Sequence, residues 1–174
     1  INPDVVFVWS SILKKINNSK LILKTSKIKH GLERLKALFK ENGVLNSITF
    51  IGREKEFKDH LNAYNEIDIA LDTFPYNGVT TSFEAIWMGA PVLTMAGYNF
   101  NSRCGESINR NLGMDQMIAK DESDYVQKIV NLSNNDDDYI KLRKFVYENA
   151  LKSPLFDKHD YSKSFFEAID QILK

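Results

Sequence analysis

The sequence has one cysteine, four prolines and no apolar stretch long enough to cross a membrane. The single cysteine, Cys104, excludes an internal disulfide and a zinc site built from several cysteines. A membrane-spanning helix needs roughly 18 or more apolar residues in succession, and no segment approaches that length. The N-terminus also lacks the basic and then apolar pattern of a signal peptide. We therefore expect a cytoplasmic protein that contacts no membrane.

Net charge is absent as well, because 23 lysines and arginines balance 23 aspartates and glutamates. A neutral protein has no overall field that attracts nucleic acid. Basic residues do gather early in the chain, at Lys20, Lys24, Lys27, Lys29, Arg34, Lys36 and Lys40. No aromatic residues alternate with them, so a solvated helix face explains them better than a nucleic-acid interface. Lys24 and Lys27 are also placed to reach a ligand from the end of a strand.

Several common kinds of site are missing from the sequence. It contains neither G-x-x-x-x-G-K-[ST] nor G-x-G-x-x-G, which disfavours P-loop and NAD-binding enzymes. The acidic run Asp136, Asp137 and Asp138 suggests a metal site at first sight. Three acids that open a helix stabilise its dipole without any ion, however. We expect no metal and no cofactor.

Short apolar segments of strand length alternate with amphipathic helical segments. The predicted strands are residues 20–24, 48–51, 67–72, 91–95 and 117–119, and the predicted helices are residues 4–16, 31–42, 56–64, 81–88, 102–112, 122–132, 136–150 and 159–173. This alternation predicts an α/β fold, with a Rossmann-like parallel sheet, helices on both faces and a helical C-terminus. Asp4 is the expected cap of the first helix. No linker or repeat is visible, so we expect one domain over residues 1–174.

The loop after the third predicted strand carries the strongest chemical signal, because ligands bind beyond the carboxyl ends of parallel strands. Turn-forming residues, including Asn77 and Gly78, lead there into hydroxyl side chains at a helix start. The free N–H groups and the dipole of such a start attract phosphate, and Gly78 lets the backbone approach closely. Thr80 and Thr81 add hydroxyl donors. Glu84, one turn further on, is placed to accept hydrogen bonds from a ribose.

The same residues have a purely structural interpretation. Residues 81–84 fit the capping-box pattern, in which Thr81 and Glu84 only bind N–H groups of the first turn. Spacing alone favours this cap over a ligand site. His60 is likewise explained, on spacing alone, as a partly exposed helix histidine.

The loop belongs to a longer pattern, with DIALDTFPYNG at residues 68–78, the pair Thr80 and Thr81, and EAIWMGAPV at residues 84–92. Shorter matches follow at residues 102–103, 111–113, 118–119 and 153–156. Over nearly the whole chain, this pattern resembles the O-linked N-acetylglucosamine transferase and SPINDLY-like family. The resemblance implies a two-domain GT-B glycosyltransferase with tetratricopeptide repeats ahead of the catalytic region. This chain would be the C-terminal Rossmann-like half.

The resemblance also assigns roles to single residues. It implies that His60 packs on uracil, that Thr80 and Thr81 bind the diphosphate, and that Glu84 contacts the ribose. Together with Asn77 and Gly78, these residues form the predicted nucleotide-sugar site, and none of them is expected to be catalytic.

The sequence departs from the family pattern at two points. Val79 stands where some members have a histidine beside the diphosphate. A glutamine and a lysine that members carry just upstream of the segment matching residues 1–4 are not part of this sequence, which opens without methionine and suggests a fragment.

We therefore predict the UDP-sugar-binding half of a protein O-glycosyltransferase, with UDP-N-acetylglucosamine as the expected donor. GDP-fucose, which other members use, is the alternative donor. The chain is expected to be inactive alone, since the acceptor site would come from a missing N-terminal domain. Two other functions stay open: a non-catalytic interaction module, which Val79 favours, and half of a nucleotide-sugar epimerase. The last helix is expected to expose Phe165, Phe166 and Ile169.

Overall fold

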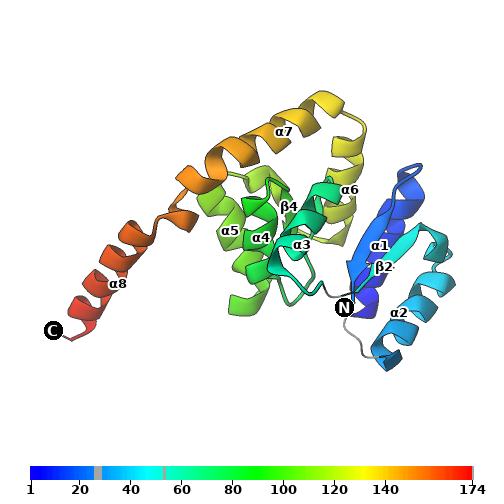
Figure 1. Ribbon diagram of the computed structural model, residues 1–174, viewed down its shortest axis with the longest axis horizontal. Helices are drawn as coiled ribbons and strands as arrows, with labels where there is room; N and C mark the ends of the chain where they lie inside the picture. The colour runs from blue at the N-terminus through cyan, green and yellow to red at the C-terminus, as the bar shows by residue number, and fades with distance from the viewer. Residues whose placement is uncertain (26–28, 53, 174) are drawn as a thin grey trace.

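The computed structural model describes residues 1–25, 29–52 and 54–173, and Figure 1 shows its elements in chain order. Within these residues the strands are β1 (Leu21–Lys24), β2 (Ile48–Ile51), β3 (Ala70–Leu71), β4 (Val92–Met95) and β5 (Ile118–Ala119). The helices are α1 (Pro3–Lys15), α2 (Lys29–Glu41), α3 (Phe57–Asn62), α4 (Thr80–Trp87), α5 (Cys104–Leu112), α6 (Glu122–Ser133), α7 (Asp136–Asn149) and α8 (Lys158–Ile172). This order confirms the predicted alternation and the helical C-terminus.

The strands are all parallel but fall into two groups. β1 pairs with β2, and β4 lies between β3 and β5. The α/β class with parallel strands is thus confirmed, whereas the expected single sheet is divided in the part of the chain that the structure describes. The division lies between β1 and β3, each of which has one edge without a partner strand there.

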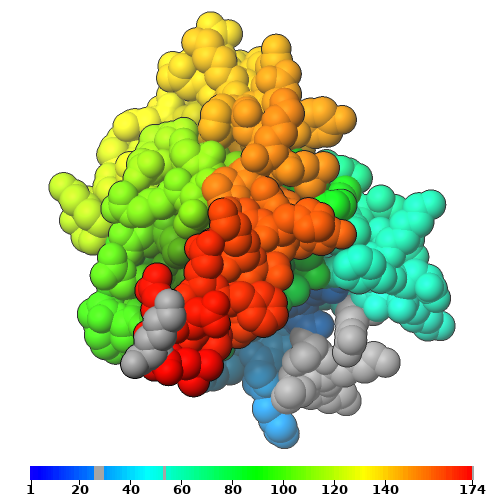
Figure 2. Space-filling model, turned by 90° about the vertical axis from the view of Figure 1, so that its left-hand side faces the viewer, coloured from blue at the N-terminus to red at the C-terminus, as the bar shows by residue number. Residues whose placement is uncertain are grey.

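Helix α8 projects from the rest of the molecule (Figure 1), and Figure 2 looks onto the side from which it extends. All of its residues are exposed, including Phe165 at 49%, Phe166 at 63% and Ile169 at 38%. The predicted exposure of these side chains is therefore confirmed. An apolar stripe on a helix normally packs against another element, so α8 presents a surface suited to a partner.

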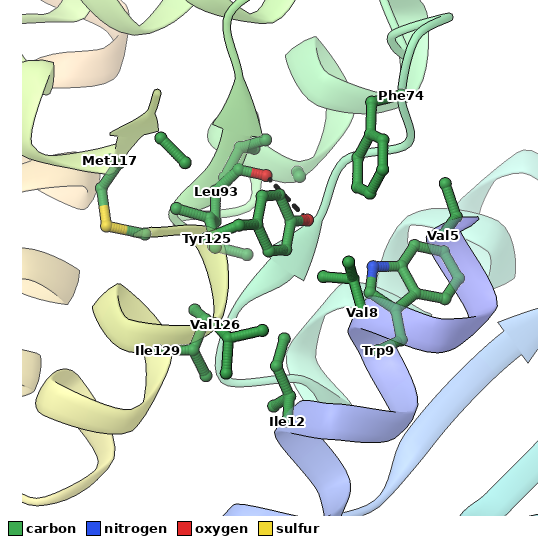
Figure 3. Packing of buried hydrophobic residues seen from close by; sticks show 14 of the residues in the cluster. Val5, Val8, Trp9, Ile12, Phe74, Leu93, Met117, Tyr125, Val126 and Ile129 are labelled. Carbon is green, nitrogen blue, oxygen red and sulfur yellow. Dashed lines mark hydrogen bonds between the residues drawn. The ribbon is translucent and has the colours of Figure 1, made fainter. Parts of the chain in front are cut away.

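The core joins α1 to α6. Val8 and Ile12, one turn apart on α1, point toward Val126 and Ile129 of α6, with Tyr125 and Leu93 beside them (Figure 3). Complete burial of such an aliphatic side chain contributes roughly 1.5–3 kcal/mol. On the other side of β4 from α1 and α6 lie α4 and α5, which contact each other and β4.

The start of α1 differs from the expectation that Asp4 caps it. Asn2 is the cap, since its Oδ1 accepts the N–H of Val5 at 2.8 Å. Pro3 follows as the first helical residue, where its missing N–H costs nothing. Asp4 lies in the first turn, where its charge favours the helix dipole instead. Asn2 Nδ2 also donates to the carbonyl of Phe74 at 3.1 Å, so α1 begins beside the loop that follows β3.

Candidate functional site

A buried carboxylate holds the loop between β3 and α4. Asp72 is only 6% exposed, and it accepts the N–H of Gly78 at Oδ1 and the hydroxyl of Thr94 at Oδ2, both at 2.7 Å. Burial raises the pKa of Asp72 to about 6, although these hydrogen bonds act in the opposite direction. A Cβ atom on Gly78 would lie 2.4 Å from Thr81 Oγ1, so a side chain does not fit there without a shift. The hydrogen bonds of Asp72 therefore hold the loop in place without any ligand.

Asn77 also acts inside this loop. Its side chain is buried, with Nδ2 donating to the carbonyl of Thr73 at 2.8 Å and Oδ1 accepting the N–H of Gly105 at 3.2 Å. Both ends of the amide are thereby used. Asn77, which directly precedes Gly78, therefore connects the loop to the start of α5 by hydrogen bonds.

The start of α4 is open. The helix begins at Thr80, with Val79 in the capping position and no side-chain cap hydrogen bond. The predicted capping box is therefore wrong, because Glu84 turns to partners on another helix. The first turn of any helix leaves N–H groups without intrahelical acceptors. Val79, Thr80 and Thr81 are all exposed, so the first turn of α4 is accessible to solvent.

Glu84 joins α4 to α3 and to the turn after α3. Its Oε2 lies 2.9 Å from His60 Nε2 and accepts the hydroxyl of Tyr64 at 3.1 Å. Tyr64 also donates to the carbonyl of Thr81 at 3.3 Å. Burial, and then the charge of Glu84, raise the pKa of Tyr64 above its usual range. No hydrogen bond from the described residues reaches Oε1 of Glu84, so one carboxylate oxygen is held and the other is available.

Lys24 reaches this cluster from the end of β1. Its Nζ contacts Nδ1 of His60. An ammonium group only donates, so this contact suits a ring that accepts at Nδ1 and donates from Nε2 to Glu84. Lys24 thereby brings a positive charge to the crevice, as the sequence suggested. Lys27, the second lysine expected there, lies outside the described residues.

Five of the six predicted residues thus lie in one region around the start of α4, namely His60, Gly78, Thr80, Thr81 and Glu84. The sixth, Asn77, is buried behind this region. Two contributors were not singled out from the sequence. Tyr64 lies four residues after His60, a spacing that puts both on one helical face. Asp72 was seen only as the end of a strand, although an acid that closes an apolar strand is itself a signal.

The acidic run at residues 136–138 shows no sign of a ligand site. Residues 136–138 form the first turn of α7, where Asn135 Oδ1 accepts the N–H of Asp138 at 3.2 Å. Among the residues with described positions, no three His, Cys, Asp or Glu side chains cluster as metal ligands would. A search of the same residues finds no helix with the length and apolarity of a membrane span.

The burial of Asp72 predicts a pH-dependent stability. Its pKa of about 6 exceeds the ordinary value of 3.8, so between these values the folded protein binds the proton more tightly than the unfolded chain. Stability from this group is therefore lost as the pH rises from about 4 to about 6.5. Relative to Asp72→Asn, the wild type should lose up to about 3 kcal/mol of unfolding free energy over this range. Urea denaturation at several pH values measures the difference.

The control is Asp170→Asn, which removes an exposed carboxylate from α8. This variant should follow the wild type at every pH. If the stability curves of the wild type and Asp72→Asn run parallel from pH 4 to 7, the buried charge has no such effect.

Comparison with known proteins gives consistent matches. The family model described as "Glycosyl transferase family 41" matches residues 1–165. A protein of Hordeum vulgare named as a probable UDP-N-acetylglucosamine–peptide N-acetylglucosaminyltransferase SPINDLY is 33% identical over 169 residues, which are 94% of this chain and 18% of the relative. Its namesake in Eustoma exaltatum is 36% identical over 163 residues, 90% of this chain and 17% of the relative.

A solved structure extends the likeness to three dimensions. A mutant of the Thermobaculum terrenum O-GlcNAc transferase superposes with a TM-score of 0.90 and 27% identity, over 98% of this chain and 33% of that one. The chain thus spans less than a fifth of the curated relatives and a third of the solved one. Both comparisons confirm the resemblance found in the sequence and the fold class of a GT-B enzyme half. The chain belongs to glycosyltransferase family 41.

Proposed function

We propose that this chain is the donor-binding half of a protein O-glycosyltransferase, and that its donor is UDP-N-acetylglucosamine. The observation that carries the proposal is the open start of α4 next to the His60 and Glu84 pair. The relatives from Hordeum vulgare and Eustoma exaltatum are named as probable UDP-N-acetylglucosamine–peptide N-acetylglucosaminyltransferases, which supports this choice of donor.

In this proposal the diphosphate binds at the first turn of α4. The backbone N–H groups and the hydroxyls of Thr80 and Thr81 donate to its oxygens, and the helix dipole favours its charge. Gly78, held by Asp72, keeps the turn close to the ligand, and Asn77 holds the loop from behind. Glu84 accepts ribose hydroxyls at its available oxygen, and His60 packs on the base.

The same donors would assist the reaction. Transfer of the sugar to a Ser or Thr hydroxyl leaves negative charge on the departing UDP. Because the loop is already fixed by Asp72, the N–H groups need no reorganisation as that charge develops, which is the condition for effective electrostatic stabilisation. Val79 supplies no imidazole here, so the backbone donors and Lys24 carry this role, and the reaction needs no metal.

The acceptor site and the rest of the sugar pocket belong, in this proposal, to an N-terminal catalytic domain, preceded by tetratricopeptide repeats. Residues 1–174 would then be one domain of a two-domain catalytic region. The exposed apolar side of α8 supports this, because it offers a surface on which such a domain can pack. Cytoplasmic location stays the prediction made from the sequence.

The first test compares nucleotides. Calorimetric titration of the full-length protein with UDP, GDP and ADP should give binding selective for UDP. Selective binding of GDP would replace the donor by GDP-fucose, and binding of none of the three would favour the non-catalytic interaction module.

Residues 1–174 alone should transfer no sugar, because in this proposal the acceptor site lies in the N-terminal catalytic domain. Radiolabelled UDP-N-acetylglucosamine, incubated with an acceptor protein, should yield labelled acceptor with the full-length protein and none with this chain. Turnover by the purified chain would contradict the division of labour between the two halves.

A further inference from the structure

Asp72 is a buried carboxylate whose charge has no cationic partner in the part of the chain that the structure describes. The groups that stabilise its charge are the N–H groups of Gly78 and Thr73 and the hydroxyl of Thr94, and all of them are neutral. An ionised carboxylate is costly to remove from water unless it is paired, and neutral hydrogen bonds offset only part of that cost. The pKa of Asp72, raised to about 6, reflects this incomplete compensation.

The other ionisable groups around Asp72 leave its charge uncompensated. From α6, the hydroxyl of Tyr125 donates to the backbone carbonyl of Asp72 at 2.8 Å. Burial raises the pKa of Tyr125 well above its usual value, so this hydroxyl stays neutral. On α5, Arg103 and Arg110 bind the carboxylate of Glu106 at 2.8 and 3.1 Å. Both arginines are therefore already paired with a different acid.

Asp72 also lies directly behind the proposed diphosphate site. Its Oδ1 accepts the N–H of Gly78 at 2.7 Å, and Gly78 lies two residues before α4 begins. On the ligand side, the ionisable groups are Lys24, His60 and Glu84, which contact one another. A diphosphate at the start of α4 would bring further negative charge close to the buried carboxylate. Like charges at such a separation favour the neutral form of the group that can bind a proton.

We propose that Asp72 takes up a proton when the nucleotide-sugar donor binds. The inference rests on the proposed function, because it needs an anion at the start of α4. The proton comes from the solvent and binds Oδ2 of Asp72, so the negative charge of the diphosphate no longer faces a second negative charge. No bond of the donor forms or breaks in this step.

The neutral acid fits the hydrogen bonds that the structure shows. Oδ1 of Asp72 can still accept the N–H of Gly78, because a protonated carboxyl group keeps acceptor capacity. A proton on Oδ2 can be donated to the hydroxyl oxygen of Thr94, which lies 2.7 Å away, since a hydroxyl both donates and accepts. The loop therefore keeps its shape in both states, and the proton changes its charge alone.

Proton uptake makes donor binding depend on pH. We expect the bound donor to raise the proton affinity of Asp72 about tenfold. Linkage then requires the donor to bind about five- to tenfold more tightly as the pH falls from about 8 to 5.5. At about pH 6.5, about half a proton should be taken up for each donor bound.

Calorimetric titration of the full-length protein with UDP-N-acetylglucosamine, in the absence of acceptor, measures this uptake. MES and imidazole release their protons with different enthalpies, so the binding enthalpies in these two buffers at about pH 6.5 give the number of protons taken up. Free UDP is unsuitable, because its terminal phosphate itself titrates at about pH 6. Asp72→Asn should bind the donor without uptake, whereas Asp170→Asn, which removes an exposed carboxylate of α8, should match the wild type.

Infrared difference spectra of the wild type give a second measurement, since a carboxylic acid band should appear when the donor is added. Donor binding with neither proton uptake nor this band overturns the inference and leaves the proposed function intact. Uptake that persists in Asp72→Asn also overturns it, because the proton then binds a group such as His60 or Glu84. If Asp72→Asn does not fold, the wild-type spectra still decide. If the donor binds at no pH, the proposed function and this inference fail together.

Discussion

Replacement of Gly105 by alanine is expected to lower the free energy of unfolding by about 2–4 kcal/mol. Gly105 is buried near the start of α5, where an added Cβ would lie 2.1 Å from Thr94 Oγ1 and 2.5 Å from Asp72 Oδ2. These two oxygens form the hydrogen bond that holds the loop behind the candidate site. The methyl group would overpack the core and break that bond at once. Urea denaturation at neutral pH measures the loss.

Gly31→Ala is the matched control. This glycine lies in α2, and an added Cβ would have no neighbour within 4 Å. Alanine favours helix over glycine by about 0.5–1 kcal/mol, so this variant should be as stable as the wild type or slightly more. If Gly105→Ala unfolds at the same urea concentration as Gly31→Ala, the region around Asp72 is not tightly packed.

The largest effect on ligand binding is expected from Glu84→Ala, which should weaken UDP binding by the full-length protein about 10- to 100-fold. A hydrogen bond to a charged group contributes about 1.5–3 kcal/mol, and each 1.4 kcal/mol is tenfold in affinity. The substitution also leaves His60 without the carboxylate that orients its ring. Calorimetric titration measures both the affinity and the enthalpy that the lost hydrogen bonds supplied.

Tyr64→Phe separates orientation from direct contact. It removes only the hydroxyl that bonds Glu84 and the carbonyl of Thr81, so a smaller loss, about three- to tenfold, is expected. Glu167→Ala, at an exposed position on α8, is the control and should bind as the wild type does. An unchanged affinity in Glu84→Ala would remove Glu84 from the donor site.

The local pattern of the sequence was enough to predict the order of elements, because each strand is a short apolar run and each helix has an amphipathic period. It also pointed to the loop before α4, since hydroxyl residues at a helix start are a local signal. The capping box was wrong for the same reason. A pattern of four residues contains no information on His60 and Tyr64, which lie 24 and 20 residues before Glu84 and compete for its carboxylate.

Strand pairing was the other feature beyond the sequence. Apolar runs predict strands but do not say which edges meet, so they could not show that β1 and β3 do not pair in the described residues. Asp72 was missed for a similar reason, because its partner Thr94 lies 22 residues away on a different strand. Strand pairing and the partner of Asp72 both depend on contacts between distant segments, which local spacing in the sequence does not predict.

A crystal structure of the full-length protein with UDP is the most direct test of the central claim. We predict the diphosphate within hydrogen-bond distance of the N–H groups of Thr80 and Thr81, with the ribose on Glu84 and the uracil against His60. UDP bound elsewhere, such as the groove between α6 and α7 lined by Lys128 and Lys141, would contradict the account, as would a start of α4 that UDP leaves empty.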